Sequence, residues 1–267
     1  MASGRNIVDL TIASQKPATV AMPMGLTGKK FVQQLTKFFD SPFKEDKRFA
    51  VQYTALLTRD RMTECEELVN TLFYDRIFNV LMSAKDEINR HKAFEILCNM
   101  VQSKIQLEKL AEQQYFQKIF EKMSHVADSK ETADLRILEK LSWLATLISF
   151  QEDMYSHIIR LNLLQFVIKI SDKKYPSQIR SNAVLAISLL TYNENLFDEI
   201  IRQGVIDLIM ALCRDQDQEL LVKQFSTLAL VHFALNKKSI SILIKKGVLD
   251  LFDTFGKNPK DQNNVII

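Results

Sequence analysis

Apolar residues along most of the chain recur every three to four positions, which is the spacing of a one-sided α-helix. The first such run follows Thr27, a candidate helix start, where Phe31, Leu35, Phe38 and Phe39 fall on one helical face. No Val/Thr-rich alternating segment predicts a strand. The pattern therefore predicts an all-α chain of short and long helices, with long ones over about 91–102, 133–150, 177–190 and 218–235.

One phrase of the sequence occurs twice near the C-terminal end. It reads EIIRQGVIDL over 199–208 and ILIKKGVLDL over 242–251, so Gly204 and Gly247 are 43 positions apart (247 − 204). An earlier copy has Asn162 in place of the glycine, 42 positions before Gly204 (204 − 162). Glycine and asparagine both tolerate the left-handed backbone that a sharp helix–helix corner needs. This spacing predicts an array of about five helical repeats with truncated end repeats.

Three segments follow from this periodicity. We expect a flexible N-terminal arm over 1–26, a helical repeat domain over 27–256 and a C-terminal tail over 257–267. Pro17 and Pro23 would interrupt any long helix in the first segment. This segment also contains Arg and Lys but few acids, so a targeting peptide is the alternative interpretation.

The long helices carry a motif of small residues that is typical of a known repeat. It reads AFEILCN over 93–99, AVLAISL over 183–189 and STLALVH over 226–232. Together with the short helix, the glycine corner, the Val-Ile-x-Leu helix and the acidic turn, this order resembles the armadillo repeat. The resemblance covers roughly 27–256 and implies an armadillo-like superhelix (α-solenoid), with a HEAT-like α-solenoid as the alternative.

The resemblance also indicates where a partner would bind. In peptide-binding members of this family, the last Asn of the motif forms a ladder that holds an extended peptide, and tryptophans lie one turn earlier. Here only Asn99 keeps the asparagine. The resemblance assigns the other asparagine positions to Leu144, Leu189 and His232, with Leu56 or Leu57 in the first unit, and the tryptophan positions to Glu95, Lys140, Leu185 and Leu228. Binding of an extended peptide by that ladder is therefore not expected.

The leucines at these positions suggest a different surface. Leu144, Leu185, Leu189 and Leu228 predict an apolar stripe, which suits an amphipathic helix of a partner protein. The alternative is that these leucines turn inward and belong to the core. Trp143, the only tryptophan, lies in the most apolar block and is expected in the core.

Basic pairs near the helix ends suggest a second surface. They occur at Lys173 and Lys174, at Lys237 and Lys238, and at Lys245 and Lys246. If they share one edge, they form a stripe for an acidic protein or for anionic lipid. The alternative is solvated loop charge, because acidic residues are interleaved. The net charge of +3 is too small to predict binding of nucleic acid.

The sequence carries no recognisable chemistry of catalysis. The four histidines fall in different units, and the spacings of zinc, phosphate-loop and nucleophile-elbow motifs are missing, so we expect no metal or cofactor. Cys65, Cys98 and Cys213 are odd in number and widely spaced, which favours buried thiols in a reducing compartment. No run reaches the about 18 apolar residues of a membrane span.

These observations predict a non-enzymatic, cytoplasmic scaffold or adaptor that binds an elongated or helical segment of another protein. Two alternatives stay open. One is a structural subunit of a cytoskeletal or ciliary assembly, and the other is a peripheral membrane scaffold that uses the basic edge.

Overall fold

The described part of the chain consists of helices and their connections. A computed structural model describes residues 28–60, 73–83, 86–102, 104–112, 114–128 and 131–257. No strand occurs among these residues. Both the predicted N-terminal arm and residues 258–267 of the predicted tail lie outside the described residues. The predicted all-α class and α-solenoid architecture are confirmed.

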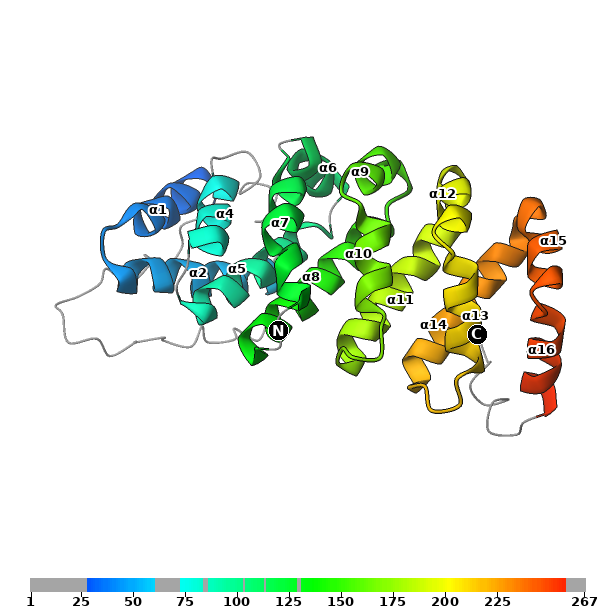
Figure 1. The fold of residues 1–267 in the computed structure, drawn as a ribbon. Helices are drawn as coiled ribbons and strands as arrows, with labels where there is room; N and C mark the ends of the chain where they lie inside the picture. Colours follow the sequence, from blue (N-terminus) through cyan, green and yellow to red (C-terminus); the bar gives the residue numbers. More distant parts are fainter. Residues whose placement is uncertain are drawn as a thin grey trace, which may run out of the picture.

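The helices form layers that follow one another along the array (Figure 1). The long helices are α2 (Lys44–Asp60), α5 (Glu87–Met100), α8 (Thr132–Ser149), α11 (Ser177–Tyr192) and α14 (Leu220–Leu235). A second layer contains α1 (Gly28–Asp40), α4 (Phe73–Ser83), α7 (Tyr115–Met123), α10 (Leu163–Ile170), α13 (Val205–Arg214) and α16 (Val248–Lys257). Short leading helices are α6 (Lys104–Glu112), α9 (Tyr155–Arg160), α12 (Phe197–Arg202) and α15 (Lys237–Lys245). The part of the chain that the structure describes also has the 3₁₀ turns η1 (Ser124–Asp128), η2 (Glu152–Met154) and η3 (Glu194–Leu196).

The long helices are packed in series, so the core runs continuously through the array. Helix α11 packs against both α8 and α14, while α5 packs against α2 and α8. Fully buried apolar side chains, among them Phe94, Leu141, Ile187 and Phe233, lie in every unit. Each unit therefore completes the core of its neighbours, as expected for a quasi-one-dimensional repeat protein.

The corners between short helices have the left-handed backbone that the sequence predicted. Gly204 has φ = 71°, Gly247 has φ = 78° and Asn162 has φ = 50°. A fourth corner, Gln114 with φ = 59°, was not predicted from its residue type. The interval from Gln114 to Asn162 is 48 residues (162 − 114), six longer than the next. The extra length lies between α7 and α8, where η1 follows α7 directly.

Two helix starts differ from the predicted ones for local reasons. Helix α5 begins four residues before His91, because the carboxylate of Asp86 accepts hydrogen bonds from the amides of Ile88 and Asn89. Helix α14 begins at Leu220, two residues after the predicted start. There the carboxylate of Asp215 accepts from the amide of Asp217 and holds the connection in a turn.

Candidate functional site

The long helices repeat one pattern of buried and accessible positions. On α11, Leu185 and Leu189 are half-buried between buried neighbours, and Tyr192 is exposed at the helix end. The pattern recurs 42 residues earlier on α8 (185 − 143) and 43 later on α14 (228 − 185). We call the resulting nine positions the long-helix patch: Trp143, Leu147, Phe150, Leu185, Leu189, Tyr192, Leu228, His232 and Leu235.

This register corrects the prediction for α8. Leu144 has 0% exposure and belongs to the core, so it cannot contact a partner. Trp143 is 38% exposed, although it was expected in the core. The predicted register on α8 was three residues off, because the equivalents of Leu185 and Leu189 are Trp143 and Leu147 and not Lys140 and Leu144 (143 − 140). Trp143 now occupies the position equivalent to Leu185, where the family resemblance places a tryptophan.

Several residues of the patch were not recognised in the sequence. Leu147, Phe150, Tyr192 and Leu235 belong to it, and the last three are exposed. The 42-residue period, applied backwards from Leu189, would have found Leu147. The accessible face of α8 was not recognised, because the sequence around Trp143 is apolar on every side of the helix. Lys140, assigned to a partner-facing position, is half-buried, and its carbonyl lies 3.8 Å from the Cys98 thiol.

The three leucines predicted on α11 and α14 lie together in the patch. Leu185, Leu189 and Leu228 are half-buried, and they are not among the partly buried side chains that pack against the core. Whether they bind a partner stays a prediction.

Helix α5 is polar at the equivalent positions, Glu95 and Asn99. The Glu95 carboxylate pairs with Lys92 at 2.6 Å. The side-chain amide of Asn99 donates to the Thr58 hydroxyl at 3.2 Å, so it links α5 to α2. On α2, Leu56 is exposed and Leu57 is half-buried, so the equivalent position stays Leu56 or Leu57.

His232 is held in place at the edge of the patch. Its Nδ1 lies 2.7 Å from the carbonyl oxygen of Ser188, so Nδ1 is the protonated nitrogen that donates. Its ring makes an edge contact with Tyr192, with 5.4 Å between ring centroids. An open hollow of about 550 Å³ lies beside these rings, and Asp153 and Glu194 contribute to its lining.

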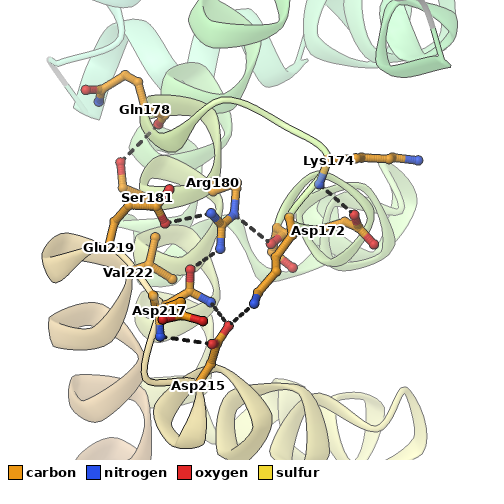
Figure 2. Close-up of polar contacts among 12 residues, drawn as sticks. Asp172, Lys174, Gln178, Arg180, Ser181, Asp215, Asp217, Glu219 and Val222 are labelled. Carbon is orange, nitrogen blue, oxygen red and sulfur yellow. Dashed lines mark hydrogen bonds and ion pairs between the residues drawn. The ribbon is translucent and has the colours of Figure 1, made fainter.

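A buried guanidinium ties α11 to the connection before α14 (Figure 2). Arg180 is 4% exposed, and its Nη1 donates to the Glu219 carboxylate at 2.6 Å. Its Nη2 donates to the side-chain oxygen of Gln218, and its Nε donates to the carbonyl of Ser171 at 3.5 Å. We call this group the Arg180 cluster. The Arg180 cluster fixes how α14 lies on α11. It therefore also fixes how the patch residues of α14 are aligned with those of α11.

The six lysines do not form one basic edge. Arg180 contacts residues preceding α14, and Ser188, near the end of α11, contacts His232 of α14, so the two helices run parallel. Lys173 and Lys174 precede α11, whereas Lys237 and Lys238 follow α14, which puts the pairs at opposite ends of these helices.

Two of these lysines are also paired with acids. Lys173 lies 2.5 Å from Asp215, and Lys246 lies 2.5 Å from Asp207. The Lys174 ammonium lies over the Tyr175 ring, 4.9 Å from its centroid, while Lys245 is exposed. The predicted basic edge is therefore wrong as a single surface.

No cluster of chemical groups stands out elsewhere in the described residues. No three His, Cys, Asp or Glu side chains converge to hold a metal ion within the ranges given above. Cys98 and Cys213 are buried free thiols, and burial raises the pKa of each to about 12. Cys65 lies outside the described residues. None of the described helices combines the length and apolar character needed to cross a membrane.

Comparisons with known proteins agree with the fold. No family model matches the sequence, and no curated protein matches it. Among solved structures, a crystal structure of computationally designed armadillo repeat proteins for modular peptide recognition matches with a TM-score of 0.72 and 16% identity. The match covers 88% of this chain and 96% of that one. The chain has an armadillo-like repeat fold.

A second designed armadillo repeat protein, solved in complex with the peptide (KR)4, matches with a TM-score of 0.73, 16% identity and the same coverage. An engineered protein matches at 0.70 with 13% identity, covering 88% of this chain and 95% of that one. At such low identity these likenesses establish the armadillo-like fold alone. The surface residues of this chain decide what its array binds.

Proposed function

We propose that this armadillo-like array is a non-enzymatic scaffold that binds an amphipathic helix of another protein across the long-helix patch. One observation carries the proposal. Eight of the nine patch positions are hydrophobic and accessible to solvent, and they are aligned on three consecutive long helices. Contiguous apolar surface of this kind marks interaction sites in soluble proteins.

The side chains of the patch favour a helical partner over an extended one. An extended peptide leaves its backbone donors and acceptors to be satisfied by the binding surface. The patch offers no side-chain amide for this, and the one retained asparagine, Asn99, already donates to Thr58. A helix satisfies its own backbone and needs only apolar contact, which leucine and aromatic side chains supply.

The spacing of the long helices sets the spacing of the partner's anchors. Packed helices lie about 8–10 Å apart. A partner helix rises about 10 Å in seven residues, so apolar residues at i, i+7 and i+14 match α8, α11 and α14 in turn. A partner helix of about 15 residues would therefore span the patch. We further propose a cytoplasmic location, which the buried free thiols Cys98 and Cys213 support.

A displayed library of random 18-residue peptides tests the proposal. Peptides selected on the full chain should carry apolar residues at helical spacing. They should bind at least about tenfold more weakly to Leu189→Asp, because a buried carboxylate disfavours apolar contact. Leu235→Asp should act in the same way, and its exposed position makes it the variant safest for folding.

The matched control is Ile159→Asp on α9, an exposed isoleucine outside the patch. Each variant should keep native far-UV circular dichroism. Selected peptides that lack helical spacing, or that bind both patch variants as well as the wild type, would refute the proposed function.

A further inference from the structure

Helices α15 and α16 at the C-terminal end of the array expose a second apolar surface. Ile240 is 42% exposed and Ile244 is 52% exposed, one turn apart on α15. On α16, Leu249 is 62% exposed and Phe252 is partly exposed. We call these four residues the end face; helices α15 and α16, which carry it, form the C-terminal end of the described array, and α15 follows α14 of the long-helix patch (Figure 1).

The preceding unit shows what normally covers such a face. The equivalents 43 residues earlier are Phe197, Ile201, Ile206 and Ile209. Three of these are buried, and Ile201 packs against the core. Helices α14 and α16 both pack against α13 there. Among the described residues, no long helix packs on α16 as α14 packs on α13. The end face therefore has the chemistry of a stacking surface.

The other end of the array exposes mainly charged and polar side chains, which decides between two kinds of stacking. Among the α1 side chains that the structure describes, the apolar residues Val32, Leu35, Phe38 and Phe39 are buried, and the exposed apolar exception at this end is Phe43, directly before α2. The exposed positions of α1 and of the first turns of α2 include Lys30, Gln33, Lys37, Lys44 and Lys47. Head-to-tail stacking would press the apolar end face against these charges. The end face of a second copy of the protein offers a matching apolar surface.

We propose that the end face binds the end face of a second copy, which gives a tail-to-tail dimer with two-fold symmetry. In such an interface each copy contributes the same patch. Charge supports this arrangement. Helix α15 carries Lys237, Lys238 and Lys245 and no acid, whereas α16 carries Asp250 and Asp253, with Lys257 at its far end. When α15 lies against α16 of the second copy, lysines meet aspartates on both sides of the two-fold axis.

The area of the face fits a small dimer. The four residues expose on the order of 350 Å² of mostly apolar surface, within the range of patches that mark interaction sites. A standard interface buries about 800 Å² per partner, of which slightly more than half is apolar. The four residues alone supply less than half of that area, so the dimer belongs with the small, weak interfaces. We therefore expect a dimer that forms only in the micromolar range of concentration or above.

Sedimentation velocity of the full chain between about 1 and 200 µM tests the dimer. The wild type should shift from monomer to dimer over this range, and Leu249→Asp and Ile244→Asp should each stay monomeric with unchanged circular dichroism. The control is Phe150→Asp, which alters an exposed side chain of the long-helix patch at the end of α8 and should still dimerise.

A charge exchange tests the two-fold arrangement directly. Lys237, Lys238 and Lys245 become Glu in one variant, and Asp250 and Asp253 become Lys in another. Each variant alone should be monomeric, because like charges then face one another, and an equimolar mixture should form a dimer. A wild type that stays monomeric at about 200 µM would overturn the proposal, as would a mixture that stays monomeric. Either result would leave the proposed peptide binding at the long-helix patch standing, because that binding is measured separately on the patch variants.

Discussion

Replacing Arg180 with methionine tests the structural reasoning most directly. The side chain is buried, and its guanidinium donates to Glu219, to Gln218 and to the Ser171 carbonyl. Methionine keeps the apolar stem but removes all three donors. We therefore expect Arg180→Met to destabilise the array without leaving a large cavity.

The magnitude follows from what each partner loses. The Glu219 side chain is 41% exposed, so water partly replaces the guanidinium, and the ion pair contributes about 1–1.5 kcal/mol. Gln218 is buried, and leaving its side-chain oxygen unpaired costs about 1–2 kcal/mol. The Ser171 bond is long and adds little. The sum is about 2–3.5 kcal/mol, a large part of the about 5–15 kcal/mol stability of a typical domain.

Urea unfolding followed by circular dichroism measures this loss, and Arg136→Met is the matched control. Arg136 also forms an ion pair between long helices, with Glu87 at 3.4 Å, but the Arg136 side chain is 65% exposed, whereas that of Arg180 is buried. The control should lose less than about 1 kcal/mol. Amide exchange across 220–235 should rise in Arg180→Met, because the cluster holds the start of α14. Equal losses of unfolding free energy in the two variants would refute the conclusion that the buried Arg180 cluster stabilises the packing of α14 on α11.

Three further predictions concern single positions. Gly204→Ala should lose about 1 kcal/mol, seen as a melting temperature lower by about 2–4 °C, because alanine is strained at φ = 71° although a Cβ meets nothing within 4 Å. An unchanged melting temperature would contradict the need for a left-handed corner. The second prediction uses a Cys65→Ser background, in which a thiol reagent at pH 8 should label Cys98 and Cys213 far more slowly in the native state than in urea. The reason is that burial raises the pKa of both thiols to about 12. Fast labelling of the native state would show that the thiols are accessible. Burial lowers the pKa of His91 below its ordinary value of 6.5, so the folded state binds this proton more weakly than the unfolded chain. The associated stability is present above pH 6.5 and is lost as the pH falls through the folded pKa. In His91→Gln the urea midpoint should therefore fall less steeply as the pH drops below 6.5. An unchanged slope would show that other groups cause the loss of stability in acid.

The corners of the array could be predicted from the sequence because their cause is local. Gly204, Gly247 and Asn162 adopt a backbone that few residue types tolerate, so residue type alone indicates the turn. Their spacing then gives the repeat. Gln114 takes the same conformation but is a residue type that fits many other sites, and it was missed.

The accessible face of the long helices was harder to predict, because it depends on how helices stack. Around Trp143 the sequence is apolar on all sides, so periodicity does not separate the core face from the outer face. The longer connection before α8 breaks the spacing from Asn99 to Leu147 (147 − 99 = 48), although the 42-residue spacing back from Leu189 still leads to Leu147. The Arg180 cluster had no local signal at all, since Glu219 lies 39 residues away in the sequence (219 − 180).

The six extra residues between α7 and α8 have a practical consequence for engineering. They lengthen the interval between corners, yet Trp143 still lies in line with Leu185, so the connection absorbs the added length without shifting α8. Lengthening a surface connection costs little free energy, because closure entropy grows only slowly with loop length. An epitope tag or a fluorescent reporter inserted after the exposed Asp128 should therefore leave both binding surfaces intact. The protein then carries its own label into cells, at a connection that belongs to neither surface.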